Sequence, residues 1–316
     1  MYKVLVTARS FGKADDRAIK LLKENDCEVI RLPEDGEENM RDLLEKEIVT
    51  ADGVIAGLEE YDKNLIDSAG RLKVISRYGV GYDKVDVEAA RSKNIIVTIT
   101  PGANGDSVAD LAVALMLDVA RNVTVMDDSF KSGEKKRPQG VELWGKTLGI
   151  IGTGRIGQGV ARRSRGFNME ILCYDIYPNE SFREEVNAKY VSLEELIRNS
   201  DFISIHSPLT DETRNMIGEK ELKEMKQDAI IVNTARGGII DEEALYYALK
   251  NGEIRGAALD ALADEHKYPD KLVSLPNCIL TPHAGAATKE AVSRMSYMAA
   301  ENLIEVLKTG KCRYAV

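Results

Sequence analysis

A glycine-rich turn near the middle of the 316-residue chain constrains the fold more than any other feature of the sequence. The apolar, β-prone run Leu148–Ile151 leads directly into the motif GTGRIG, and a helix-like stretch follows. Gly152 permits a tight turn, Gly154 lets the backbone approach a pyrophosphate, and Gly157 lets helix and strand pack closely. The N-terminus of the helix would offer free N–H groups and a positive dipole to the phosphates. The pattern therefore predicts a dinucleotide-binding βα unit.

The next apolar run, Met169–Tyr174, ends at Asp175, eighteen residues after the last glycine of the turn. A carboxylate at that place accepts hydrogen bonds from a ribose 2′-hydroxyl and repels a 2′-phosphate. The residue that follows is Ile176, and not an arginine or lysine that would reverse this preference. The sequence therefore predicts NAD, rather than NADP, as the cofactor.

The glycine turn comes too late in the chain for the nucleotide-binding domain to begin it. Strand-like and helix-like segments alternate before the turn and again after it, which is typical of parallel sheets covered by helices. The strand-like runs are residues 3–7, 28–32, 53–56, 73–76 and 95–98, and then 148–151, 170–174, 202–206, 229–233, 256–259 and 278–280. Six strands in the second series suit a doubly wound nucleotide-binding domain.

Helical periodicity marks two long segments around this second series. One is Ser107–Arg121, with Ser107 as its expected cap, and the other is Thr288–Lys308, with Thr288 as N-cap and Gly310 just past its end. We expect the second helix to cross back to the first domain. The expected fold is α/β, with two Rossmann-like doubly wound parallel-sheet domains and the cofactor domain inserted into a discontinuous substrate domain. Residues 1–100 plus 287–316 would form the substrate domain, and 101–286 the NAD-binding domain.

Composition excludes several other classes of protein. The net charge of −9 and the pI of about 5.2 argue against nucleic-acid binding. The longest apolar run, Leu111–Leu117, is far too short to span a membrane, and strand-like residues from Lys3 leave no room for a signal peptide. The four cysteines form no CxxC pair and only three histidines are present. We therefore expect a cytoplasmic protein with free thiols, no metal site and no membrane partner.

Polar side chains follow the last three strand-like runs. Arg236 comes after the fourth strand of the second series, Asp260 and Glu265 after the fifth, and His283 after the sixth. Ligands of open α/β sheets bind beyond the carboxyl ends of the strands, so these side chains would share an edge with the glycine turn. A histidine with a nearby carboxylate suits the proton transfer that accompanies hydride transfer, and an arginine suits a substrate carboxylate. Taken singly, His283 could instead be a structural histidine, Arg236 a surface arginine and Glu265 a solvated acid.

These segments together resemble the D-isomer-specific 2-hydroxyacid dehydrogenases, and in particular short members like phosphoglycerate dehydrogenases or hydroxypyruvate reductases. The resemblance extends over essentially the whole chain. Its carriers are RYGVGYDKVD (77–86), TPGANGDSVAD (100–110), GIIGTGRIG (149–157), HSPLTDETRNMI (206–217), VNTARGGIIDEEAL (232–245), ALDALADE (258–265) and TPHAGAAT (281–288).

The resemblance implies a role for each matching residue. His283 is expected to protonate the keto oxygen during reduction and to act as the base in reverse, with Glu265 hydrogen-bonded to its imidazole. Arg236 is expected to bind the substrate carboxylate and polarise the carbonyl. The other expected substrate-binding residues are Arg77, Tyr78, Gly79, Val80 and Gly81. The expected cofactor-binding residues are Gly152, Gly154, Arg155, Ile156, Gly157, Asp175, His206, Pro208, Thr234, Asp260, His283 and Gly285, with Asp260 near the nicotinamide carboxamide.

The sequence departs from the family pattern at two places. Tyr78 stands where a small residue is frequent, so its phenol could narrow the substrate pocket or donate a hydrogen bond there. The segment from Ala261 to His266 lacks the proline that often follows the catalytic glutamate, although Glu265 keeps its register.

The sequence does not decide which 2-hydroxy acid is the substrate. The resemblance implies NAD-dependent interconversion of a D-2-hydroxy acid and its 2-keto acid, with 3-phosphoglycerate and phosphohydroxypyruvate as one candidate pair. The candidate phosphate ligands are Arg9, Lys13 and Arg77, and each of these could equally be an ordinary surface charge. The alternatives are a glyoxylate/hydroxypyruvate reductase, a dehydrogenase of an unusual 2-keto acid, and an NADH-sensing corepressor-like binding protein. A homodimer through the cofactor domain is also expected, using the helix 107–121 and the segment up to Trp144.

Overall fold

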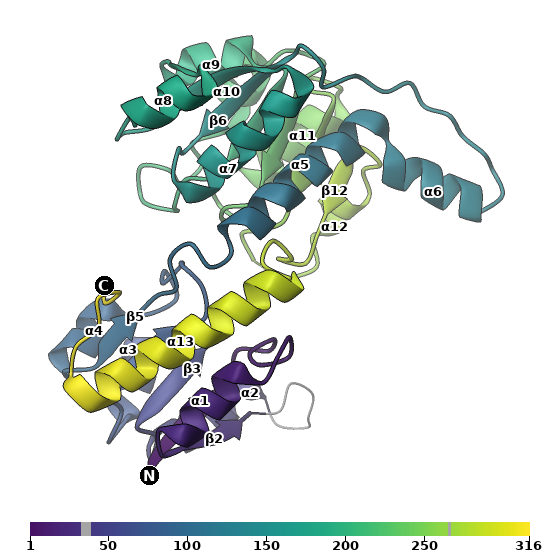
Figure 1. Ribbon diagram of the computed structural model, residues 1–316. Coiled ribbons are helices and arrows are strands. Elements are labelled where there is room, and N and C mark those ends of the chain that lie inside the picture. Colours follow the sequence, from purple (N-terminus) through teal and green to yellow (C-terminus); the bar gives the residue numbers. More distant parts are fainter. Residues whose placement is uncertain (33–38, 265–266) are drawn as a thin grey trace. The chain divides into compact units, whose positions relative to one another are not determined.

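The computed structural model describes residues 1–32, 39–264 and 267–316, and the chain divides into two compact units (Figure 1). Unit 1 comprises residues 1–104 and 287–316, and unit 2 comprises residues 105–286. Both are built from parallel strands connected by helices, so the prediction of two parallel-sheet α/β domains is confirmed.

Within the described part of unit 1, five strands form one parallel sheet. They are β1 (Tyr2–Val6), β2 (Cys27–Arg31), β3 (Gly53–Ala56), β4 (Val74–Arg77) and β5 (Ile96–Thr98), in the order β2-β1-β3-β4-β5. The helices of this unit are α1 (Arg17–Glu24), α2 (Met40–Ile48), α3 (Lys63–Ser68), α4 (Val87–Ser92) and α13 (Lys289–Thr309). The strand order reverses between β1 and β3, and such a reversal opens a crevice at the carboxyl ends of the two strands.

Alternation of side chains along β1 places one apolar set on each face of this sheet. Val4 and Val6 pack with α1 and α13, while Leu5 packs on the opposite face with α2, α3 and α4. All three side chains are fully or almost fully buried. The near-continuous apolar character of the strands follows from this two-sided burial.

Helix α13 is an integral part of unit 1. Thr288 caps it by accepting a hydrogen bond from the N–H of Ala291 (3.2 Å), and Gly310 ends it in the left-handed conformation, so both predicted caps are confirmed. The hydroxyl of Ser76 on β4 donates to the carbonyl of Ala299 (2.9 Å). Leu303 lies so close to Gly53 that a Cβ there would come within 3.0 Å of it. The helix therefore packs directly onto the sheet.

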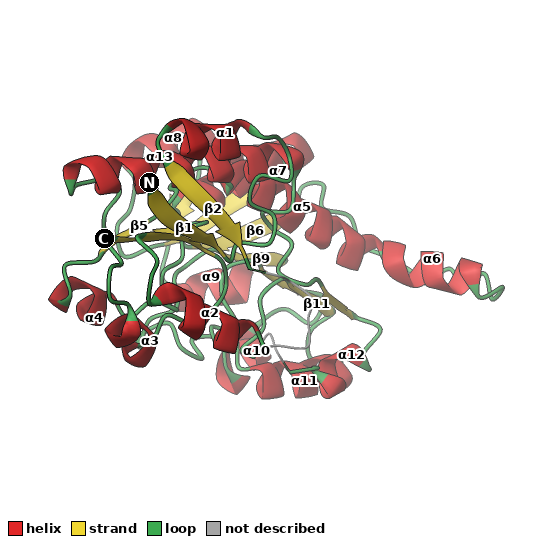
Figure 2. Ribbon diagram, turned by 90° about the horizontal axis from the view of Figure 1, so that it is seen from below, coloured by secondary structure: helices red, strands yellow, loops and turns green. Residues whose placement is uncertain are grey.

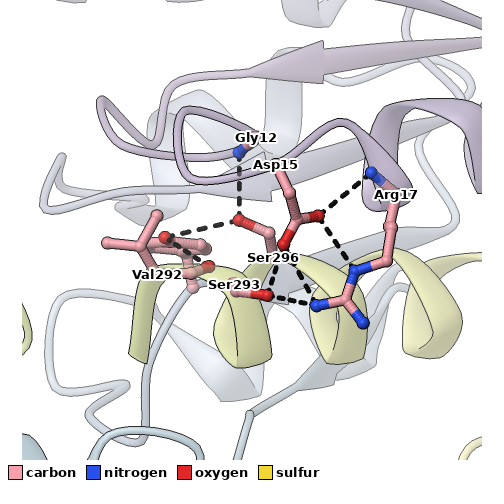
Figure 3. A network of polar contacts seen from close by, with 7 residues as sticks. Gly12, Asp15, Arg17, Val292, Ser293 and Ser296 are labelled. Atoms are coloured by element: carbon pink, nitrogen blue, oxygen red, sulfur yellow. Dashed lines mark hydrogen bonds and ion pairs between the residues drawn. The ribbon is translucent and has the colours of Figure 1, made fainter. Parts of the chain in front are cut away.

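The segment that follows β1 is held against the start of α13 by polar contacts (Figure 3). The N–H of Gly12 donates to Ser296 Oγ (3.0 Å), and Ser293 Oγ donates to Asp15 Oδ2 (2.5 Å). Arg17 donates both to Asp15 and to Ser293. These contacts hold residues 14–16 outside the helix, which explains why α1 begins at Arg17 and not at Ala14.

Unit 2 contains a larger parallel sheet. In its described residues the strands are β6 (Thr147–Ile151), β7 (Glu170–Tyr174), β8 (Lys189–Tyr190), β9 (Phe202–Ile205), β10 (Ile230–Asn233), β11 (Gly256–Leu259) and β12 (Cys278–Leu280). Their order is β12-β11-β10-β9-β6-β7-β8, so the topological reversal lies between β6 and β9. The predicted number of six strands is wrong by one, because β8 is a two-residue edge strand with no detectable periodicity.

The helices of unit 2 cover both faces of its sheet. They are α5 (Gly105–Arg121), α6 (Val123–Lys131), α7 (Arg155–Ser164) with the short 3-10 turn Arg165–Phe167, α8 (Glu180–Val186), α9 (Leu193–Asn199), α10 (Glu219–Glu224), α11 (Glu242–Lys250) and α12 (Asp270–Val273). Helices α5, α7 and α8 bury Leu148 and Ile150 on one face, and α9, α10 and α11 bury Ile151 and Ile203 on the other.

Two features of these helices differ from the sequence-based expectations. Helix α5 begins at Gly105, so Ser107 lies inside its first turn instead of capping it, and Asp110 pairs with Arg163 of α7 (2.5 Å). Helix α6, which was not predicted, extends away from the sheet of unit 2 (Figures 1 and 2). In the described part of the chain, no helix combines the length and apolar character that a membrane span needs.

Candidate active site

The glycine turn after β6 adopts the geometry that the sequence predicts. Gly152 has φ +93°, and a Cβ there would lie 2.7 Å from the backbone of His206 and Ser207. Only glycine fits this position, because the turn requires a left-handed backbone and a close approach of the segment after β9. Gly157 is buried in α7 directly against the turn.

Gly154 differs from Gly152, since nothing in the described part of the protein requires a glycine there. Its φ of −67° is ordinary for any residue, and a Cβ would meet no atom within 4 Å. It stands at the N-cap of α7, where the exposed Arg155 and half-buried Ile156 form a first turn whose backbone N–H groups have no partner within the helix. Open space beside helix N–H groups is what a bound pyrophosphate requires, so these residues fit a dinucleotide.

Asp175 lies immediately after β7 and is held in place by the glycine turn. Its Oδ2 accepts hydrogen bonds from the backbone N–H of Thr153 (2.6 Å) and from its hydroxyl (3.0 Å), and its Oδ1 accepts from the N–H of Tyr177 (2.9 Å). The Thr153 hydroxyl also contacts the phenol of Tyr190 on β8 (2.9 Å). Thr153 and Tyr190 thus orient the carboxylate, a function that no sequence signal indicated.

His206 follows β9 at the reversal of the strand order. Its Nε2 lies 2.8 Å from Ser204 Oγ and its Nδ1 lies 3.5 Å from Thr234 Oγ1, while Pro208 is exposed in the loop beyond. Desolvation lowers the pKa of His206 to about 3. The ring is therefore neutral near pH 7 and is not suited to act as a general acid there.

The loop that carries Arg236 is shaped by the buried side chain of Asn233 at the end of β10. The Asn233 amide donates to the carbonyl of Arg236 (2.7 Å), and its oxygen accepts from the N–H of Ala235 (3.0 Å). Arg236 itself donates from Nη1 to the carbonyl of Ala235 (2.8 Å). Asparagine commonly closes such local turns, so this positioning role could have been found in the sequence.

His283 lies in a loop that is held by Asp260. The carboxylate of Asp260, only 2% exposed, accepts hydrogen bonds from Thr281 Oγ1 (2.5 Å), the N–H of Ala284 (2.7 Å) and the N–H of Gly285 (2.8 Å). His283 has φ +52°, an unusual conformation for a residue other than glycine that is characteristic of functional sites. Both oxygens of Asp260, expected near the nicotinamide, are thus used to hold the histidine loop. Glu265 lies outside the described residues.

The segment expected to bind the substrate carboxylate follows β4 in unit 1. Arg77 is 5% exposed and donates from Nη1 to the carbonyl of Ala56 (2.8 Å) and from Nε to the carbonyl of Gly81 (2.9 Å). Gly79 has φ +149°. The backbone N–H groups of Gly79, Val80 and Gly81 meet no acceptor in the described part of the chain. The geometry thus provides a cluster of donors that suits an anion.

Tyr78 directs its phenol away from this cluster of donors. The hydroxyl donates to the carbonyl of Val292 (3.2 Å) and lies 3.3 Å from Ser10 Oγ, and the ring packs edge-on against Phe11. Tyr78 therefore stabilises the contact between the β1–α1 loop and α13. Its backbone, and not its phenol, belongs to the expected substrate-binding segment.

Comparison with known proteins identifies the family. The model of the D-isomer specific 2-hydroxyacid dehydrogenase NAD-binding domain matches residues 113–285. The chain belongs to this family of dehydrogenases. A glyoxylate reductase of Thermococcus litoralis is 45% identical to it over 289 residues, which cover 88% of this chain and 87% of that relative. The resemblance found in the sequence, the enzyme class and the use of a nicotinamide cofactor are thereby confirmed.

Two further similarities support the same family. A D-3-phosphoglycerate dehydrogenase of Methanocaldococcus jannaschii is 43% identical over 311 residues, which cover 98% of this dehydrogenase chain and 58% of that relative. The crystal structure of a Thermus thermophilus protein superimposes with a TM-score of 0.89 at 39% identity and covers 99% of both chains.

Proposed function

We propose that this dehydrogenase uses NADH to reduce a short 2-keto acid, such as glyoxylate or hydroxypyruvate, to the D-2-hydroxy acid. The observation that carries the proposal is the loop of His283, which the buried carboxylate of Asp260 fixes at the same sheet edge as the glycine turn. Unit 2 would act as the NAD-binding domain and unit 1 as the substrate domain.

Each chemical step is assigned to a residue of this chain. A nicotinamide, when bound, supplies the hydride to C2 of the keto acid. His283 donates a proton to the keto oxygen, and Glu265 is its expected carboxylate partner. Arg236 of unit 2 is proposed to bind the substrate carboxylate and polarise the carbonyl, and the N–H groups of residues 79–81 are the carboxylate donors proposed for unit 1. In the reverse direction His283 accepts the proton.

The preference for NADH is supported by Asp175. Its carboxylate is oriented by Thr153 and would accept hydrogen bonds from ribose hydroxyls while repelling a 2′-phosphate. Ile176 and Tyr177, which follow it, are 74% and 81% exposed and carry no positive charge to offset that repulsion.

The preference for an unphosphorylated acid is supported by the state of the three candidate phosphate ligands. Arg77 is buried and donates to two backbone carbonyls, while Arg9 and Lys13 are exposed on the β1–α1 loop. The relative of Thermococcus litoralis named a glyoxylate reductase points the same way. The phosphoglycerate dehydrogenase relative keeps 3-phosphoglycerate as the second candidate substrate.

A homodimer is proposed through unit 2. Val123 and Phe130 on α6, with Trp144 beyond it, are 51%, 67% and 64% exposed, and burying such large apolar side chains against a second copy would be favourable. Helix α6 extends away from the sheet of unit 2 (Figure 2), and we propose that a second copy packs against it. The four free thiols suit a reducing cytoplasm.

The test is the rate of NADH oxidation with glyoxylate, hydroxypyruvate, pyruvate, oxaloacetate and phosphohydroxypyruvate, repeated with NADPH. We expect turnover of the short acids with NADH, and His283→Ala should lower kcat by about 100-fold or more. Tight NADH binding without turnover of any of these acids would overturn the proposal and favour a sensing role.

A further inference from the structure

Glu59 carries a polar atom that the described residues leave without a hydrogen-bond partner. Its Oε2 has no solvent access and, among the described residues, no hydrogen-bond partner. A carboxylate oxygen buried in this way costs free energy unless a donor is supplied from outside the protein. Such an atom is a candidate acceptor for a ligand.

The position of Glu59 is that expected for a ligand-binding residue. It follows β3, next to the reversal of strand order between β1 and β3 in unit 1. The point where Gly57 would carry a Cβ lies 2.8 Å from Glu59 Oε2 and 3.0 Å from the carbonyl oxygen of Thr7 at the end of β1. The carboxylate therefore lies at the carboxyl ends of the two strands that flank the crevice.

Glu59 also lies near the segment after β4 whose backbone N–H groups, those of residues 79–81, are the proposed carboxylate donors. The carbonyl of Ala56, at the end of β3, accepts hydrogen bonds from the N–H of Tyr78 (3.0 Å) and from Arg77 Nη1 (2.8 Å). The charges of Glu59 and Arg77 also act on the same buried phenol, that of Tyr61. Desolvation is the main cause that raises the pKa of Tyr61, the charge of Glu59 raises this pKa further, and the charge of Arg77 lowers it. Glu59 is thus a neighbour of the segment proposed to bind the substrate carboxylate.

We infer that Glu59 accepts a hydrogen bond from a hydroxyl on C3 of the substrate and so selects 3-hydroxy-2-keto acids. The inference rests on the proposed function, in which residues 79–81 bind the carboxylate on C1. A carboxylate beside that site can accept a hydrogen bond from a hydroxyl on C3. It can form no such bond with glyoxylate, which has no C3, and its negative charge repels a phosphate on C3. Glu59 is therefore a specificity residue and takes no part in the transfer of hydride or proton.

The test compares wild type, Glu59→Gln and the matched control Glu60→Gln on four acids. Glu60 is the next residue, and its side chain is exposed. The acids are hydroxypyruvate, pyruvate, glyoxylate and phosphohydroxypyruvate, which differ in the presence of C3 and in its substituent. We expect Glu59→Gln to lower kcat/KM for hydroxypyruvate by about tenfold or more, to change that for glyoxylate and pyruvate by less than about threefold, and to raise that for phosphohydroxypyruvate. Glu60→Gln should change none of them.

The outcomes separate the inference from the proposed function. Equal losses for all four acids in Glu59→Gln would assign the residue a structural role and overturn the inference. An unchanged preference for hydroxypyruvate over pyruvate would also overturn it, while leaving the reductase activity established. Failure of the wild type to turn over any of the acids would overturn the proposed function itself.

Discussion

His206 is neutral in the folded protein because desolvation lowers its pKa from 6.5 to about 3. Below pH 6.5 the unfolded chain therefore binds more protons at this residue than the folded chain does. The contribution of His206 to stability is complete above pH 6.5 and is lost as the pH falls from 6.5 toward 3.

This difference predicts a pH-dependent stability of the cofactor-free protein. Between about pH 7.5 and about pH 5, the free energy of unfolding should fall more steeply in wild type than in His206→Gln, by at most about 1.4 kcal/mol per pH unit below about pH 6.5. Urea unfolding followed by circular dichroism at both pH values measures the two slopes. Parallel slopes would show that His206 is not the titrating group.

Asp260 also acts at the scale of one residue, through the loop of His283. Replacing it with asparagine removes an acceptor oxygen from the contacts to Thr281, Ala284 and Gly285. We expect Asp260→Asn to lower kcat by about tenfold or more while the Kd of NADH changes by less than about threefold. Fluorescence titration with NADH gives the Kd. If the Kd rises in step with the loss of kcat, the carboxylate contacts the cofactor instead.

At the scale of elements, the turn between β6 and α7 contains two glycines with different physical requirements. Gly152 is required by the protein, since its φ is +93° and a Cβ would meet the backbone after β9. Gly154 is not required by the described part of the chain, since a Cβ there meets nothing, and we expect any need for glycine at this position to come from the bound cofactor. Alanine substitutions should therefore separate folding from binding.

We predict that Gly152→Ala lowers the free energy of unfolding by about 2–4 kcal/mol. Gly154→Ala should leave stability within about 0.5 kcal/mol of wild type and weaken NADH binding by about tenfold or more. Thermal unfolding and NADH titration of the two variants check this. Wild-type affinity in Gly154→Ala would place the pyrophosphate elsewhere.

The same turn shows why part of the site was predictable from sequence. Gly152 and Gly154 belong to a short glycine motif, and Asp175 ends the next apolar run at a fixed distance after it, so all three can be found in the sequence. Asn233 closes a local turn and could have been found in the same way, whereas Thr153 acts through side-chain contacts with Asp175 and Tyr190 that no periodicity marks. Glu59 was missed because its significance lies in the absence of a partner among the described residues, which only a folded structure can show.

Helices and strands were likewise predictable where short stretches of sequence determine them. Strands buried on both faces are continuous apolar runs and were predicted within a residue or two, as for β3 and β7. The two-residue strand β8 and the exposed helix α6 were missed, because neither has a buried face that would give the sequence a period. The start of α1 was misplaced because contacts with α13, almost three hundred residues away in the chain, hold residues 14–16 outside the helix.

At the scale of the whole molecule, the exposed apolar side chains near α6 predict self-association. We expect wild type to sediment as a dimer at micromolar concentration, because burying Phe130 and Trp144 removes apolar surface from water. Phe130→Asp with Trp144→Asp should give a monomer with an unchanged circular dichroism spectrum. A control pair with serine at the exposed Tyr247 and Tyr268 should leave the dimer intact. A monomeric wild type would contradict the proposal.

The return of α13 to unit 1 also affects how the protein is made. Unit 2 consists of the consecutive residues 105–286, whereas one face of the sheet of unit 1 is covered by α1 together with the distant α13, whose Leu303 packs against β3. During synthesis at about 5–20 residues per second, α13 follows β5 by roughly 10–40 s, and the part of that apolar face which α13 covers lacks its helix during this time. The face of the sheet that α13 covers is therefore completed only after all of unit 2 has been synthesised.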